Sequence, residues 1–148
     1  MILLDTNVLG RIPDPADPQR VAARRAMDVL AAQGQRLVIV PQNLYEFRAV
    51  ATRKPGRPPT GQNGLGMTPD QASLWLRYFQ RRFKLLPDQE DLFPRWHDLV
   101  RSFGVTGLRS HDARLVASMQ CHGITQLLTF NADDFKRFPI ALIDPASL

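Results

Sequence analysis

The chain has 148 residues, 44% of them hydrophobic, which is enough for one globular domain with a true core. No apolar run approaches the ~20 residues of a membrane helix, and the N-terminus lacks the basic and long apolar segments of a signal peptide. A single cysteine excludes an intrachain disulfide. We therefore expect a cytoplasmic protein that forms one domain over residues 1–148.

The formal net charge is +5, and the basic residues are sixteen arginines and three lysines. Arginine binds phosphate through parallel hydrogen bonds, and a basic balance favours a polyanionic partner such as a nucleic acid. A solvated basic surface explains the same composition equally well. Charge alone leaves both interpretations open.

Apolar runs alternate with segments of helical period, although the run at 2–4 is too short to be typed by its period. In chain order, the expected elements are a strand at 2–4, a helix at 19–32, a strand at 37–40, a helix from Pro41 past Ala51, a loop at 53–68, a helix at 69–83, a strand at 84–87, helices at 91–103 and 111–122, a strand at 124–130, a short helix at 132–138 and a strand at 141–143. Strands that alternate with helices imply parallel βαβ units with right-handed crossovers. The predicted fold class is therefore α/β, a three-layer α/β/α sandwich with a central parallel sheet.

Capping residues mark the start of several helices. Asp5 begins a run of residue types that cap a helical turn. Thr68 and Gln71 form a capping-box pair, and Ser110 is the expected cap of the helix that follows it.

In the helix at 91–103, the periodicity places three side chains on the inner face, namely Phe93, Trp96 and Val100.

Acidic residues gather at one edge of the predicted sheet. Ligands of such folds bind at the carboxyl ends of the strands, and Asp5 directly follows the first strand. Glu46 lies about one turn into the helix after the second strand. Asp112 opens a helix whose N-terminus returns to the same edge. The segment after the strand at 124–130 adds Asn131, Asp133 and Asp134.

Carboxylates crowded into one cleft repel each other, and a hard divalent cation such as Mg²⁺ or Mn²⁺ relieves that repulsion. Such ions activate water and stabilise the leaving oxygen of a phosphodiester, while surrounding arginines hold an RNA backbone. Each acid also has a simpler explanation: Asp5 as a helix cap, Asp112 as a favourable charge at a helix N-terminus, and Glu46 as a solvated helix residue. Their joint convergence favours a metal-dependent nuclease site.

Four segments, in this order and at these separations, match the pattern of a known family. They are MILLDTNVL at 1–9, VPQNLYEF at 40–47, SHDARLVA at 110–117 and LTFNADDF at 128–135. Together they resemble the PIN domain, and within it the VapC-type toxins of bacterial toxin–antitoxin pairs. The resemblance covers nearly the whole chain. It implies that Asp5, Glu46 and Asp112 are catalytic ligands of Mg²⁺ or Mn²⁺, and that Thr6 and Asn7 steady the site.

The last of these segments departs from the commoner pattern. Asn131 stands two residues after Thr129, where many relatives carry an aspartate. The resemblance makes Asn131 a further catalytic and metal-binding residue, with Thr129 in support. Its neutral amide oxygen removes one negative charge from the site. We expect Asp134 to compensate as a metal ligand, with one tightly bound ion and one weakly bound ion.

The function that the resemblance implies is hydrolysis of RNA by a toxin that a cognate antitoxin holds in check. Toxins of this type usually form homodimers, and we expect the aromatic helix at 69–83 to offer apolar surface for pairing. We also expect the antitoxin to place an arginine among the carboxylates, because a guanidinium can replace the missing cation.

Two other functions compete with this interpretation. A non-catalytic PIN-like module for RNA binding or scaffolding would need no carboxylate cluster, and the intact Asp5, Glu46 and Asp112 count against it. A phosphate-accepting signalling domain also carries acids at strand ends. Such a domain needs an aspartate after a middle strand and a lysine after a late one. The segments after Val40 and Thr129 supply neither.

Overall fold

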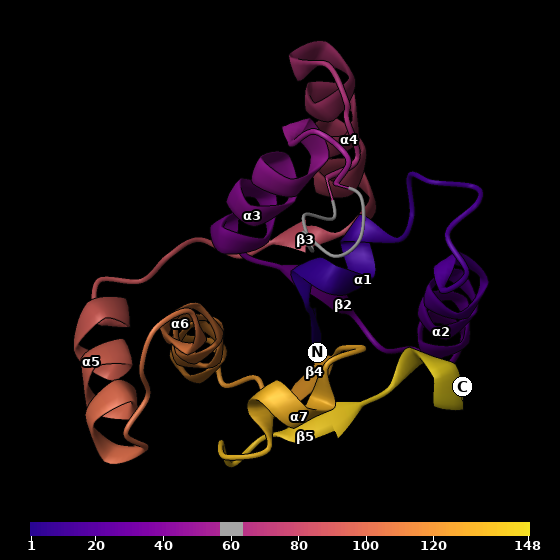
Figure 1. The fold of residues 1–148 in the computed structure, drawn as a ribbon. Coiled ribbons are helices and arrows are strands. Elements are labelled where there is room, and N and C mark those ends of the chain that lie inside the picture. The colour runs from indigo at the N-terminus through magenta and orange to yellow at the C-terminus, as the bar shows by residue number, and fades with distance from the viewer. Residues whose placement is uncertain (57–63) are drawn as a thin grey trace.

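The computed structural model describes residues 1–56 and 64–148. Within these ranges, five strands form one parallel sheet in the order β3-β2-β1-β4-β5 (Figure 1). The strands are Ile2–Leu4 (β1), Leu37–Ile39 (β2), Lys84–Leu85 (β3), Gln126–Leu128 (β4) and Ala141–Ile143 (β5). Every strand pair is parallel, which confirms the predicted fold class.

Alternate residues of the central strands face two separate cores. Ile2 and Leu4 belong to one buried cluster, whereas Leu3 between them belongs to the other. This alternation follows from the pleat, which points successive side chains to opposite faces. Because both faces are buried, β1 and β2 read as continuous apolar runs without polar alternation.

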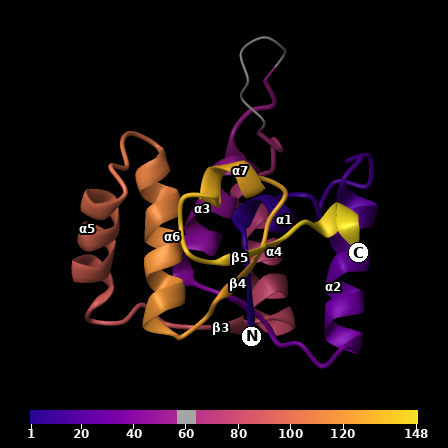
Figure 2. The ribbon, with the colours of Figure 1, turned by 90° about the horizontal axis from the view of Figure 1, so that it is seen from below.

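Helices cover both faces of the sheet, so the architecture has the three predicted layers (Figure 2). One face carries Thr6–Gly10 (α1), Arg20–Ala32 (α2), Pro41–Thr52 (α3) and Pro69–Arg82 (α4). The opposite face carries Leu92–Ser102 (α5) and Arg109–Cys121 (α6), joined by side chains from the segment around Ala132–Phe135 (α7). The final turn, Pro145–Ser147 (η1), packs against α2. No helix in the described residues combines the length and apolar character that crossing a membrane requires.

Most of the predicted caps are confirmed. Asp5 is the N-cap of α1, and its side chain accepts from the backbone N–H of Asn7. Thr68 and Gln71 form both hydrogen bonds of a capping box at α4. Gly34 has φ +76°, the left-handed conformation that ends α2 and that side chains other than glycine rarely adopt. The described parts of the predicted 53–68 loop contain no helix or strand. Residues 57–63 of that loop lie outside the described residues.

Three predictions about local structure were wrong. Ser110 does not cap α6, because the helix already begins at Arg109 and Leu108 occupies the cap position without a side-chain bond. Phe93 does not face inward: its side chain is 68% exposed, since Leu92 and Leu99 take the inner face of α5. The strand predicted at 124–130 is only β4, residues 126–128, because the N–H of Ile124 still bonds to Met119 at the end of α6 and the chain bends at Phe130.

Candidate active site

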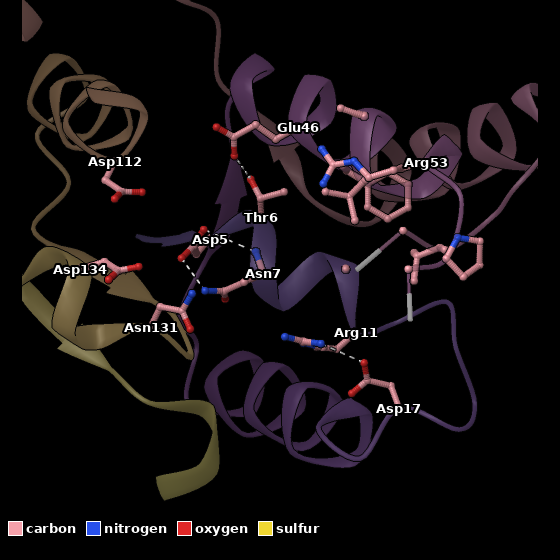
Figure 3. Close-up of a pocket in the computed structure, with 18 of the residues that line it drawn as sticks. Asp5, Thr6, Asn7, Arg11, Asp17, Glu46, Arg53, Asp112, Asn131 and Asp134 are labelled. Atoms are coloured by element: carbon pink, nitrogen blue, oxygen red, sulfur yellow. Dashed lines mark hydrogen bonds and ion pairs between the residues drawn. The ribbon is translucent and has the colours of Figure 1, made fainter. Parts of the chain in front are cut away.

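A pocket of about 580 Å³ opens at the carboxyl edge of the sheet, beside the point where β1 lies between β2 and β4. The chain runs from β1 to β2 on one side and later returns to β4 on the other. This makes the β1–β4 boundary a topological switch point, where the loops diverge and leave a crevice. The predicted metal-binding residues all line this pocket: Asp5, Glu46, Asp112, Asn131 and Asp134 (Figure 3).

Asp5 sits at the floor of the site and is 8% exposed. Its Oδ2 accepts from the Thr129 hydroxyl at 2.6 Å and from Asn7 Nδ2 at 2.8 Å. The Thr129 hydroxyl in turn accepts from the backbone N–H of Asn131, and Asn7 Oδ1 accepts from the backbone N–H of Phe130. These bonds tie the turn after β4 to the start of α1, so the carboxylate has one defined position.

The surroundings of Asp5 disfavour its ionised form, which a nearby positive charge would stabilise. Burial raises the pKa of Asp5 from its ordinary 3.8 to about 6, and the negative charges of Glu46 and Asp112 add to the rise. The hydrogen bonds from Thr129 and Asn7 oppose it but do not cancel it. A cation in the pocket would favour the ionised carboxylate and so reverse this effect.

Glu46 points from α3 toward the same hollow (Figure 3), and both of its oxygens accept hydrogen bonds. Oε2 accepts from the Thr6 hydroxyl at 2.7 Å, and Oε1 accepts from Gln42 Nε2 at 2.8 Å. Asn43 is fully buried beside them. It caps α3 from within by accepting from the backbone N–H of Val40, and it donates to the backbone carbonyl of Leu4. Asn43 thereby fixes the start of α3 against the end of β1.

Asp112 on α6 and Asp134 on α7 both pair with the guanidinium group of Arg109. The Arg109 guanidinium pairs with Asp112 through Nη1 at 3.2 Å, and the same nitrogen contacts Asp134. Partial burial raises the pKa of Asp112, while the hydrogen bond and charge of Arg109 act in the opposite direction. Asp133, in contrast, turns outward: its side chain is 85% exposed and pairs with Lys136.

The residues fit a divalent cation in chemistry, although not yet in spacing. Four carboxylates and the Asn131 amide supply only oxygen donors, the kind that Mg²⁺ and Mn²⁺ prefer. Within the described ranges, however, no three Asp, Glu, His or Cys side chains lie close enough together to hold a metal ion as they stand. Arg109 pairs with two of these carboxylates, so a metal at this place would have to displace the guanidinium from Asp112 and Asp134.

The other end of the pocket is basic and apolar. Arg11 and Arg53 lie there (Figure 3), and the apolar lining of the pocket includes Phe47 and Leu65. Arg11 Nη1 pairs with Asp17 at 3.1 Å. Asp17 also lines the pocket and offsets the charge of Arg11, so Arg53 supplies the remaining positive charge of this basic end, which suits a phosphate chain held beside a metal site.

Sequence reasoning missed three residues that shape the site: Gln42, Asn43 and Arg109. For Asn43 a signal existed, because it stands two residues after Pro41, at the third helical position, where a polar side chain can cap the helix. Gln42 lies four residues before Glu46, a spacing that puts both on one helix face. Arg109 gave no signal among sixteen arginines.

Comparison with known proteins supports the resemblance seen in the sequence. The sequence model of the PIN domain matches residues 2–141. No curated protein matches the chain.

Solved structures share the fold at low sequence identity. FitAcB from Neisseria gonorrhoeae is 17% identical with a TM-score of 0.69, and the match covers 100% of both chains. A toxin–antitoxin complex from Klebsiella pneumoniae is 21% identical with a TM-score of 0.63, over 98% of each chain. VapC20 from Mycobacterium tuberculosis, a toxin that cleaves the sarcin–ricin loop, is 16% identical with a TM-score of 0.60, over 95% of this chain and 98% of that one.

Proposed function

Because the chain belongs to the PIN-domain family, we propose that it is a cytoplasmic, Mg²⁺- or Mn²⁺-dependent endoribonuclease that hydrolyses RNA phosphodiester bonds. The observation that carries this proposal is the gathering of four carboxylates and the Asn131 amide around one pocket. The Mycobacterium tuberculosis neighbour is a toxin that cleaves the sarcin–ricin loop, which agrees with RNA as the substrate class. We also propose that residues 1–148 form one nuclease domain.

Each part of the pocket has a role in this proposal. Thr129 and Asn7 orient the buried Asp5, and Thr6 orients Glu46. A bound divalent cation would supply a water nucleophile near neutral pH and neutralise the charge that develops on the phosphate. Arg11 and Arg53 line the basic end of the pocket, where they would contact the phosphates beside the scissile one. The residues proposed to hold the cation are Asp5, Glu46, Asp112, Asn131 and Asp134.

A cleavage assay with purified protein and a fluorescent single-stranded RNA tests the proposal. We expect cleavage with Mg²⁺ or Mn²⁺ and none with EDTA. Asp5→Asn, Glu46→Gln and Asp112→Asn should each lower the rate by at least about 10²-fold, because each removes a charge from the cation's surroundings. Glu90→Gln is the matched control, since Glu90 is the other glutamate of the chain and is exposed.

Two outcomes would contradict the proposal. Cleavage that survives EDTA would exclude a metal-dependent reaction. RNA binding without cleavage, at any concentration of Mg²⁺ or Mn²⁺, would instead support the alternative of a non-catalytic PIN-like RNA-binding or scaffold module.

We also propose that the chain is the toxin of a toxin–antitoxin pair and forms a homodimer. One structural neighbour is a toxin–antitoxin complex. Leu74 and Tyr78 on α4 are 60% and 46% exposed, which leaves apolar surface for a protein partner. Light scattering at micromolar concentration should give twice the monomer mass of 16.7 kDa. A monomer at that concentration would count against pairing, and unimpaired growth of a bacterial host that expresses the chain would count against a toxin.

A further inference from the structure

We propose that Gln42, locked in place by Arg114, is a positioning residue that fixes the Glu46 carboxylate relative to Asp112 and thereby sets how tightly the pocket binds a divalent cation. The inference rests on the proposed function, because it concerns the same cation. Neither Gln42 nor Arg114 lies among the residues expected to hold the metal. The proposal follows from one chain of hydrogen bonds between α3 and α6.

Gln42 is 5% exposed, and its side-chain amide is fully used. One Nε2 hydrogen goes to Glu46 Oε1 at 2.8 Å, and Nε2 also donates to the backbone carbonyl of His111 at 2.8 Å. Oε1 accepts from Arg114 Nη1 at 2.9 Å. A buried amide with both donors and its acceptor satisfied has one stable position.

The partners of Gln42 also fix which way its amide faces. A guanidinium can only donate, and a backbone carbonyl can only accept. If the amide flipped, its oxygen would face both the Glu46 carboxylate and the His111 carbonyl, and its nitrogen would face Arg114. Gln42 therefore presents an N–H to Glu46 at all times. Arg114 is held in turn, because its Nη2 pairs with Asp88 at 2.8 Å.

This chain of bonds joins two helices that pack on opposite faces of the sheet. Gln42 and Glu46 belong to α3, whereas His111 and Arg114 lie on either side of Asp112 in the first turns of α6. The helices meet around the carboxyl edge, where Glu46 and Asp112 face the same hollow (Figure 3). Because Gln42 bonds to both helices, it ties the position of one carboxylate to the position of the other.

Glu46 is thus oriented before any cation arrives. Gln42 holds one carboxylate oxygen and Thr6 holds the other, yet each oxygen keeps a further lone pair for a metal. Partners of this kind usually change metal affinity or activity 10- to 100-fold when they are lost. A glutamine that stabilised the fold without orienting Glu46 would change stability and leave metal affinity unchanged. Metal affinity therefore separates the two roles.

Binding of Mn²⁺ to the full-length chain, measured by titration calorimetry without RNA, tests the proposal. Gln42→Met keeps the length of the side chain but makes no hydrogen bond, and we expect about tenfold weaker Mn²⁺ binding. Arg114→Met should weaken binding in the same direction and less strongly. Gln80→Met is the matched control. Gln80 is an exposed glutamine on α4 that bonds only to a backbone carbonyl of its own helix, and its loss should leave the affinity unchanged.

The double variant tests whether Arg114 acts through Gln42. Once Gln42 is methionine, adding Arg114→Met should weaken Mn²⁺ binding no further. The melting temperature of each variant is recorded as well. If Gln42→Met fails to fold, Arg114→Met alone decides, because Arg114 is partly exposed and its stem is preserved. RNA kinetics should show the loss in kcat, with KM for RNA unchanged, since neither residue lies at the basic end of the pocket.

The outcomes separate this inference from the function on which it rests. If the wild type binds Mn²⁺ and both single variants bind it equally well, Gln42 is not a positioning residue and the proposed function stands. If Arg114→Met weakens binding in addition to Gln42→Met, Arg114 acts through its own charge, and the proposed chain is wrong. If the wild type binds no Mn²⁺, the proposed function fails and the inference fails with it.

Discussion

Replacing Asp5 with asparagine should make the metal-free protein more stable. The carboxylate is buried, and its ionised form is disfavoured in the fold, as the pKa of about 6 shows. Asparagine has the same shape and no charge. Its amide oxygen can keep the two short hydrogen bonds that Oδ2 accepts from Thr129 and Asn7. The remaining contact, from the backbone N–H of Asn7 to Oδ1, is only a 3.5 Å interaction.

The size of the effect follows from the shift in pKa. A rise from 3.8 to about 6 for Asp5 corresponds to roughly 3 kcal/mol at 1.36 kcal/mol per pH unit. Because the pKa of Asp5 is higher in the folded protein than in the unfolded one, protonation of Asp5 favours folding. The wild type has the full contribution below pH 3.8 and loses it as the pH rises through 6. At pH 7, Asp5→Asn should therefore gain up to about 3 kcal/mol, and at pH 5 only about half of that.

Urea unfolding in EDTA at pH 7 and pH 5 measures both values. Asp98→Asn is the control, since Asp98 is exposed on α5 and its replacement should change the free energy of unfolding by less than about 0.5 kcal/mol. An Asp5→Asn variant that is no more stable than the wild type at pH 7 would refute the reasoning. So would a gain that does not shrink between pH 7 and pH 5.

Three further predictions concern the surroundings of the site and the core. Thr129→Val should lower the free energy of unfolding by about 1–3 kcal/mol in urea, because it removes three hydrogen bonds, of which the one to Asp5 is buried; an unchanged free energy would show that these bonds do not stabilise the fold. Arg109→Gln should strengthen Mn²⁺ binding several-fold by calorimetry, because it frees the two carboxylates that Arg109 bridges, and weaker binding would contradict this. Phe79→Ala should cost about 3–5 kcal/mol, since Phe79 is fully buried, whereas Phe93→Ala should cost no more than about 0.5 kcal/mol; equal losses in thermal unfolding would show that the burial pattern is wrong.

Elements with strong local signals were predictable from the sequence. The apolar run at β2 and the periodic segment at α2 have the types that the sequence indicated, whereas the run at β1 is too short for its period to indicate a type. The capping box at Thr68 also predicted the start of α4. These features depend on residues within a few positions of each other, so the sequence contains them directly.

Convergence of the acids was predictable for a different reason. In a parallel α/β fold, the end of every strand and the start of every following helix lie at one edge. Asp5, Glu46 and Asp112 were therefore placed near each other by topology before any distance was known, and all three line the pocket. Their roles as metal ligands remain a prediction.

Contacts between residues distant in the sequence were decided only by the tertiary structure. The hydrogen bond from Gln42 to the carbonyl of His111 joins residues 69 positions apart, and the pair of Arg109 with Asp134 joins α6 to α7. Phe93 illustrates the same limit, because the choice between Phe93 and Leu92 for the inner face depends on how α5 docks against α6. Local period and capping thus determined the elements and the edge where the acids meet. The partner of each acid, and the pKa that burial gives Asp5, depend on packing and charge across the whole fold.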